Sequence, residues 1–186
     1  MSRILFFSYF LVFLFGACES PSVQNGKVSR QGHGQKTAGE DELIARYSTQ
    51  LIAHPGTQDE IDENIILNFL IDSLWDFQRS PSGIYYQIEK AGEGEHPTPQ
   101  STVTTQYRGT FLNGKEFDSS YRKGAPLMIS VNRVIKGWQE ALQMLKPGGR
   151  GVFIIPSKLA YGQEGFQGLI GPNAVLIFEV ELIKFR

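Results

Sequence analysis

Apolar and polar residues change their spacing along this chain near residue 83. Before that point, apolar residues recur every three or four positions over 40–53 and over 58–78, which predicts two helices. From there onward, apolar and polar residues alternate, as they do in strands with one buried face. The alternation is strongest near the C-terminus, where four residues are expected to face the core: Leu176, Phe178, Val180 and Leu182. A helical region over 40–80 is therefore expected to precede a strand-rich domain over 83–186.

The strand-rich domain consists of short alternating segments separated by turns. Asn113-Gly114 is a strong hairpin signal, and a return strand is predicted to follow it over 115–121. One segment, 134–145, switches back to helical spacing and ends at Pro147-Gly148-Gly149. One short helix against an antiparallel sheet of about five strands is an α+β arrangement.

The N-terminal segment has the features of a targeting signal. A nearly unbroken apolar run follows Arg3 within residues 1–17. It is shorter than the roughly 20 residues of a transmembrane helix and fits a secretory signal peptide. The run ends in Gly16-Ala17-Cys18, which resembles the cleavage site of bacterial lipoproteins. That resemblance implies removal of 1–17 and a lipid on Cys18; the alternative is an ordinary signal peptide or an N-terminal anchor.

Residues 18–39 are poor in apolar side chains. After the cysteine, Val23 and Val28 are the only sizeable ones. Such a segment cannot bury enough surface to offset the entropy that it would lose on ordering, so we predict a flexible tether. A tether would let an anchored domain reach its substrates.

Composition excludes several kinds of function. A net charge of -1 gives no electrostatic basis for binding nucleic acid. Cys18 is the single cysteine, so no disulfide can form within the chain. The three histidines lie far apart and lack the spacing of metal ligands. We therefore expect neither a metal nor a cofactor.

Four strings in the second half of the chain carry a resemblance to a known family. They are TQYRGTFLNGKEFDSS, NRVIKGWQEALQML, PGGRGVFIIPSKLAYG and GPNAVLIFEVELI, in this order. Together they resemble the FKBP-type peptidyl-prolyl cis/trans isomerases over residues 83–186. The resemblance implies a five-stranded antiparallel sheet wrapped around one short helix. It also includes bacterial lipoprotein forms, some of them linked to gliding motility.

The resemblance implies a pocket for a proline ring. Asp118 and Tyr161 would make polar contacts, Tyr107 would line a wall, and these three are the expected catalytic residues. The expected substrate-binding residues are Phe117, Val134, Ile135, Trp138, Phe166, Ile170 and Phe178. Trp138 would form the floor, and the backbone N–H of Ile135 would donate to a substrate carbonyl. Without the resemblance, these aromatic residues would be interpreted as ordinary core.

This sequence departs from the family pattern at three places. Phe166 stands where small members have a loop histidine, and Leu127 stands where a phenylalanine is common. Either Arg122 or Lys123 must replace an arginine that supports the aspartate. These changes bear on substrate preference and on macrolide binding.

The function implied is isomerisation of X-Pro bonds in exported proteins, by an enzyme held to the cell envelope by lipid. The expected location is the outer membrane, facing the periplasm. The expected partners are proline-containing segments of exported proteins. Two alternatives remain: a binding or chaperone module without turnover, and a structural lipoprotein of an envelope machine. The helices at 40–80 either pack on the following domain or form a dimer contact, so a monomer or a weak dimer is expected.

Overall fold

The computed structural model describes residues 39–186. The predicted signal peptide at 1–17, the lipid site at Cys18 and the tether up to residue 38 lie outside the described residues. Among the residues from 39 onward, no helix is long and apolar enough to cross a membrane.

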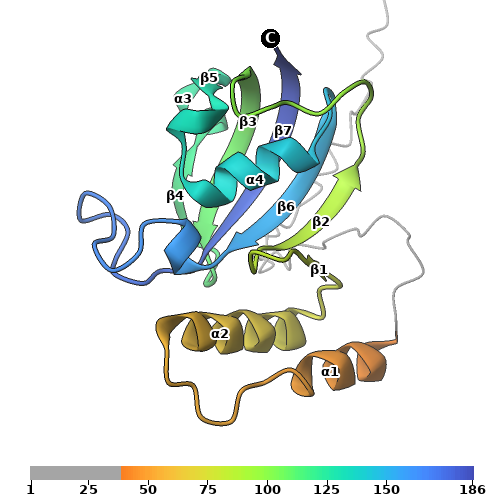
Figure 1. Cartoon of the computed structure of the whole chain (residues 1–186), viewed down its shortest axis with the longest axis vertical. Coiled ribbons are helices and arrows are strands. Elements are labelled where there is room, and N and C mark those ends of the chain that lie inside the picture. The colour runs from red at the N-terminus through yellow and green to blue at the C-terminus, as the bar shows by residue number, and fades with distance from the viewer. Residues whose placement is uncertain (1–38) are drawn as a thin grey trace, which may run out of the picture. The chain divides into compact units, whose positions relative to one another are not determined.

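One antiparallel sheet forms the centre of the described part (Figure 1). Its strands are β1 (Gln78–Arg79), β2 (Tyr85–Lys90), β3 (Thr102–Phe111), β4 (Glu116–Ser119), β5 (Leu127–Ser130), β6 (Gly149–Ile155) and β7 (Leu176–Phe185). The order across the sheet is β1-β2-β6-β7-β3-β4, and β5 also pairs with β3. The antiparallel α+β prediction is confirmed, but the sheet has seven strands rather than five.

Strand β3 explains part of that difference in strand number. One edge of β3 pairs with β7 along the whole of β3's length, from Val103 to Phe111. Its other edge is shared, because β5 pairs with 102–105 and β4 pairs with 108–110. The two-residue β1 begins at Gln78, the last residue of the second predicted helix.

Six helical segments accompany the sheet. They are α1 (Glu40–Ser48), α2 (Gln58–Ser73), α3 (Ser120–Lys123), the 3₁₀ helix η1 (Val131–Arg133), α4 (Lys136–Met144) and the 3₁₀ helix η2 (Ser157–Leu159). Both N-terminal helices end earlier than predicted. Leu74, at φ 54°, stops α2 in a left-handed turn, and the Trp75 N–H donates to the Leu70 carbonyl.

The predicted return strand over 115–121 is also shorter than expected. It ends at Ser119, whose side chain accepts a hydrogen bond from the Arg122 N–H and so caps α3. Gly124, at φ 74°, ends this helix after one turn. Beyond Ser119 the chain therefore turns out of the sheet.

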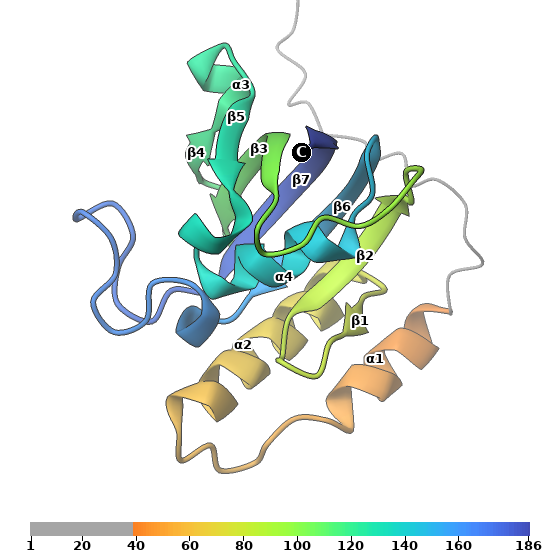
Figure 2. The same cartoon turned by 45° about the horizontal axis from the view of Figure 1, so that its top comes forward.

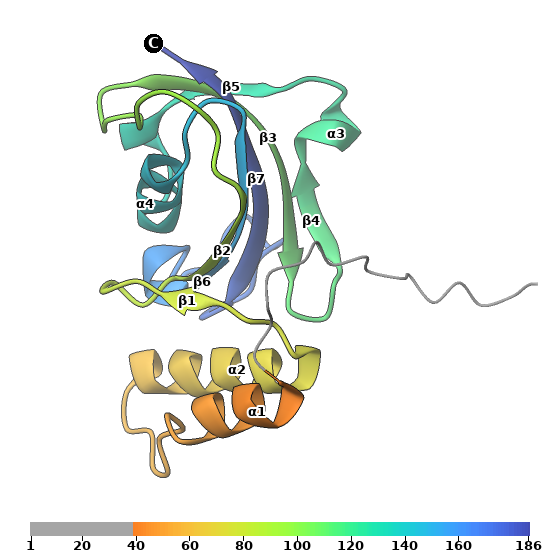
Figure 3. The same cartoon turned by 90° about the vertical axis from the view of Figure 1, so that its right-hand side faces the viewer.

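Helices pack on both faces of the sheet, and on the outer face they cover one end only, because Arg108 and Arg150 remain exposed there. On one face, α4 lies in the hollow of the curved sheet (Figure 3). The buried residues of that side include Val103, Leu142, Phe153, Leu176, Phe178, Val180 and Leu182. On the other face, α1 and α2 pack against β2, β6 and β7. The buried residues of this outer core are Leu43, Tyr47, Ile66, Leu67, Leu70, Phe77, Tyr85, Val152, Ile154, Val175 and Ile177.

Specific hydrogen bonds tie α1 to the segment that follows α2. The buried Tyr47 hydroxyl accepts from the Phe77 N–H at 2.9 Å and donates to the carbonyls of Trp75 and Phe77. Thr57 and Glu60 form a capping box at the start of α2, as predicted. The helical region thus packs on the sheet, which is one of the two alternatives that the sequence left open.

Candidate functional site

Four aromatic side chains meet on the hollow face of the sheet. The Trp138 ring lies 5.1 Å from Tyr107 and 5.3 Å from Phe178, measured between ring centroids. Phe117 lies 5.6 Å from Phe178. All three pairs are nearly perpendicular, the edge-to-face arrangement that aromatic quadrupoles favour. We call Tyr107, Phe117, Trp138 and Phe178 the aromatic cluster.

The cluster draws its members from four elements distant in sequence. Tyr107 comes from β3, Phe117 from β4, Phe178 from β7 and Trp138 from the first turn of α4. Gly109 on β3 lets these rings approach the backbone. A Cβ atom there would lie 2.6 Å from Phe117 Cζ and 3.0 Å from Phe178 Cε1, far inside van der Waals contact.

Trp138 has an unusual feature for a buried residue. Its Nε1 atom is buried and finds no hydrogen-bond partner among the described residues. An unpaired buried donor costs about 1–3 kcal/mol, so such groups are uncommon and are often found at functional sites.

A polar group lies beside the cluster. The Tyr107 hydroxyl donates to Asp118 Oδ2 at 2.6 Å. Lys123 Nζ donates to the same carboxylate at 2.8 Å and to the Tyr107 hydroxyl at 2.9 Å. The Ser119 N–H donates to Asp118 Oδ1 at 2.9 Å. The carboxylate is therefore held in one orientation by three donors.

The structure selects between the two cations that could support Asp118. Arg122 turns away, where it donates to the Phe117 carbonyl and pairs with Glu116 at 3.4 Å. Lys123 makes the ion pair with Asp118, at 2.7 Å. Both residues lie on the one-turn helix α3, and its orientation decides which of them points toward the carboxylate.

These contacts shift several pKa values. Burial alone would raise the pKa of Asp118, but the hydrogen bonds from Lys123 and Tyr107 outweigh it, and the pKa lies below its ordinary value. The pKa of Tyr107 is raised by burial and by its bond to Asp118. The pKa of Lys123 is raised by its bond to Asp118. At neutral pH the site therefore carries a carboxylate, an ammonium and a neutral phenol.

Three predicted substrate-binding residues lie against this core. Val134 and Ile135 are partly buried just before α4, and Ile170 is buried in the loop before β7. Ile135 is the N-cap residue of α4. Its N–H therefore has no acceptor within the helix and can serve another carbonyl.

The remaining two site residues lie on the loop between η2 and β7, which projects from the end of the sheet (Figure 2). The Tyr161 and Phe166 rings are 4.8 Å apart at 32°. Phe166 and Ile170 form a small antiparallel bridge, and Phe166 is 40% exposed. Burial raises the pKa of Tyr161, and the negative charge of Asp118 raises it further.

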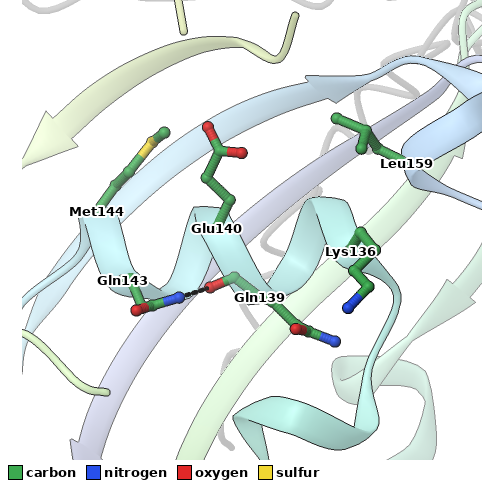
Figure 4. Close-up of a pocket in the computed structure, with 6 residues that line it drawn as sticks. All are labelled: Lys136, Gln139, Glu140, Gln143, Met144 and Leu159. Carbon is green, nitrogen blue, oxygen red and sulfur yellow. Dashed lines mark hydrogen bonds between the residues drawn. The ribbon is translucent and has the colours of Figure 1, made fainter. Parts of the chain in front are cut away.

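A different hollow lies along the exposed side of α4. It has a volume of about 540 Å³ and is lined by Lys136, Gln139, Glu140, Gln143, Met144 and Leu159 (Figure 4). Five of these six residues are on α4, and none is a predicted site residue. Four of its six lining residues carry flexible polar or charged side chains, whereas the aromatic cluster gathers four rings beside the fixed Asp118 carboxylate. We therefore assign the candidate site to the cluster.

Sequence reasoning missed two residues that shape the cluster. Gly109 is one of them, and the signal that could have found it is a glycine inside a strand, which often marks a close backbone approach. Phe111 packs against Phe117 at 5.2 Å between ring centroids.

The part of the chain that the structure describes has no group of three or more His, Cys, Asp or Glu residues able to hold a metal.

Known proteins are similar in sequence to the part of the chain that carries the candidate site. Residues 93–183 match the family model of FKBP-type peptidyl-prolyl cis-trans isomerases. The peptidyl-prolyl cis-trans isomerase Mip of Coxiella burnetii is 47% identical over 105 residues, which are 56% of this chain and 46% of Mip. FkpA of Escherichia coli is 47% identical over 107 residues, which are 58% of this chain and 39% of FkpA. The chain thus spans less than half the length of these relatives.

Solved structures agree in fold as well as in sequence. The crystal structure of Escherichia coli FkpA is similar at a TM-score of 0.60 and 36% identity, over 79% of this chain and 62% of that one. AtFKBP13 is similar at a TM-score of 0.55 and 36% identity, over 60% of this chain and the full 100% of that one. The similarity runs through every strand that supports the aromatic cluster. The chain therefore belongs to the FKBP-type peptidyl-prolyl cis-trans isomerase family.

Proposed function

We propose that this chain catalyses cis/trans isomerisation of X-Pro bonds in exported proteins. The single observation that carries this proposal is the aromatic cluster: four rings, the buried Trp138 among them, make three nearly perpendicular contacts beside a fixed carboxylate. The family membership of the chain supports the same activity. Tyr107, Asp118 and Tyr161 are the proposed catalytic residues.

The chemistry of the reaction suits such a site. Rotation about an X-Pro bond faces a barrier of about 18–20 kcal/mol, which comes from amide resonance. No bond is made or broken, so neither a nucleophile nor a metal is needed. The twisted amide has lost double-bond character and is less polar than the planar one. An apolar surface such as that of Trp138 and Phe178 therefore favours the twisted state relative to the planar state.

Polar groups at the edge would hold the chain on either side of the proline. The Ile135 N–H and the Tyr161 hydroxyl are the proposed donors to substrate carbonyls. The unpaired Trp138 Nε1 lies at the floor of the same site. Fixing the flanking peptide in a turn removes the entropy cost of reaching the transition state.

A protease-coupled assay with a proline peptide, and the refolding of a protein limited by proline isomerisation, test this proposal. Asp118→Ala should lower kcat/KM about tenfold or more while the variant stays folded. Met128→Ala is the matched control, because Met128 is 60% exposed on β5 and is not a predicted site residue. Wild-type protein that is folded and gives no rate enhancement would refute the proposal.

A second part of the proposal concerns location. We propose that the chain is an envelope lipoprotein, with a lipid on Cys18 and a tether over 18–39. What supports it is the Gly16-Ala17-Cys18 sequence after an apolar leader. Cys18→Ser should abolish incorporation of labelled palmitate and release the protein from membranes. A Cys18→Ser protein that still fractionates with the outer membrane would contradict it.

One observation favours a second candidate, a binding module that holds unfolded clients. Phe166 is 40% and Leu169 is 53% exposed at the tip of the loop beside the site. Apolar residues gathered at an exposed tip are typical of interaction surfaces. Replacing both with serine should weaken suppression of client aggregation. If it does so without changing kcat/KM for a short peptide, binding and turnover are separate functions.

A further inference from the structure

Helix α2 carries a buried carboxylate at a position where the pattern calls for an apolar residue. Asp62, Ile66 and Leu70 follow each other at intervals of four and form the buried stripe of the helix. Asp62 is 0% exposed. Burying a carboxylate is unfavourable unless hydrogen bonds satisfy it, so a role limited to packing would be better served by leucine.

The carboxylate is satisfied by one local donor and one distant donor. Asp62 Oδ1 accepts from Gln58 Nε2 at 2.7 Å, one turn earlier on α2. Asp62 Oδ2 accepts from the Ser157 N–H at 2.7 Å. Ser157 is the first residue of η2, so its N–H has no acceptor within that helix. Asp62 supplies the missing acceptor from a different element.

Ser157 in turn fixes the turn that presents Tyr161. Its carbonyl accepts from the Ala160 N–H at 3.0 Å and from the Gly162 N–H at 2.9 Å, so that Tyr161 lies between two tethered residues. The Gly162 carbonyl accepts from the Asn173 N–H at 2.8 Å and joins both ends of the loop. A continuous series of hydrogen bonds therefore leads from α2 to the site loop.

A second link runs parallel to the first. Lys158 on η2 pairs with Asp59 on α2 at 2.6 Å. Both side chains are about half exposed, so this pair contributes little by itself. It does show that η2 meets α2 along one side of the helix, at residues one turn apart.

We propose that Asp62 is a positioning residue for Tyr161, and that α2 is therefore a working part of the isomerase site. Asp62 does not touch the substrate; it acts through Ser157. Residues 58–73 lie outside the segment that matches the family, 93–183. The effect on turnover rests on the proposed isomerase function, whereas the effect on the loop does not.

The test compares three single-substitution variants of the full chain with wild type. Asp62→Leu completes the apolar stripe and removes the acceptor. Asp62→Asn keeps one oxygen for the Ser157 N–H and is the conservative variant. Ile66→Ala is the matched control, because Ile66 is the next buried residue on the same stripe and belongs to the outer core away from η2.

The expected results separate positioning from stability. Asp62→Leu leaves the Ser157 N–H without its acceptor but gains apolar burial, so it should lower the thermal midpoint no more than Ile66→Ala does. It should nevertheless lose roughly tenfold or more in kcat/KM, since small displacements at a site cost that much. Asp62→Asn should recover most of that loss. Ile66→Ala should lower the midpoint but keep kcat/KM when assayed well below it. Amide NMR shifts in Asp62→Leu should extend through 157–166, whereas those in Ile66→Ala should stay in the outer core.

Two results would overturn the inference. One is folded Asp62→Leu with wild-type kcat/KM and unshifted resonances over 157–166. The other is an equal loss of activity in Asp62→Leu and Ile66→Ala, which would mean that stability alone is at work. If wild type has no isomerase activity, the proposed function fails, but the NMR comparison still decides the role of Asp62. If Asp62→Leu does not fold, the same measurements are made on Asp62→Ala, which also removes the acceptor but adds no volume.

Discussion

Gly109 lies under the aromatic cluster, and filling its empty space should damage both stability and turnover. In Gly109→Ala the new methyl group would be placed 2.6 Å from Phe117 Cζ and 2.8 Å from Phe117 Cε2. Ordinary carbon contacts are about 3.5–4.0 Å, so the Phe117 ring must move by about 1 Å. Phe111 and Phe178, at 5.2 and 5.6 Å between ring centroids, stand in its way.

The size of the effect follows from two opposing contributions. Overpacking of a dense core costs about 1–3 kcal/mol, and the restricted backbone of alanine in the unfolded chain returns about 0.4–1 kcal/mol. The net loss in the free energy of unfolding should be about 1–2 kcal/mol, or about 2–8 °C in Tm. Because Phe117 and Phe178 are proposed substrate contacts, kcat/KM should fall roughly tenfold.

Urea denaturation followed by fluorescence measures the first quantity, and the protease-coupled assay measures the second. Gly56→Ala is the control, since its Cβ would meet only Glu60 Oε2 at an ordinary 3.8 Å and Gly56 lies far along the chain from the cluster. The double variant Gly109→Ala/Phe117→Leu should regain stability but not activity. A Gly109→Ala protein with wild-type stability and wild-type kcat/KM would show that the rings are not packed as described.

Three further predictions concern single contacts. The pKa of Asp118 in the folded chain lies below its ordinary value of 3.8, so ionised Asp118 stabilises the fold at pH values above 3.8. This stabilisation is lost as the pH falls through the folded-state pKa. Lys123→Ala should therefore cost about 0.2–1 kcal/mol at pH 7, a difference that disappears in acid denaturation curves below that pKa. Tyr47→Phe leaves the buried Phe77 N–H unpaired and should cost about 1–3 kcal/mol in urea, with kcat/KM unchanged. Phe166→Ala should raise KM for apolar peptides without moving Tm, because the ring is exposed and stacks only on the loop.

The sequence predicted the inner face of β7 correctly and its outer face only in part. Its alternation placed Phe178 and Val180 in the core, and both are buried. Ile177 is buried too, because α1 and α2 cover this end of the outer face of the sheet. Alternation shows which residues of a strand are apolar, but it does not show which distant element will cover them.

The candidate site shows a similar limit. The family pattern indicated which residues gather around Trp138, because aromatic residues at fixed separations are visible in a sequence. It could not choose between Arg122 and Lys123, which are neighbours on a one-turn helix. Nor could it connect Asp62 with Ser157, 95 positions away, because no local pattern marks a hydrogen bond between two elements.

The outer core that α1 and α2 form with the sheet also limits how this chain can be divided. Removing both helices would expose apolar side chains on three strands, among them Tyr85, Ile154 and Ile177. A fragment cut at the borders of the family match, 93–183, would lose β1 and β2 as well, and its exposed Ile154 and Ile177 would favour aggregation. For grafting or shortening this chain, the smallest transferable unit begins at α1, and any exchange between relatives must include helices and sheet together.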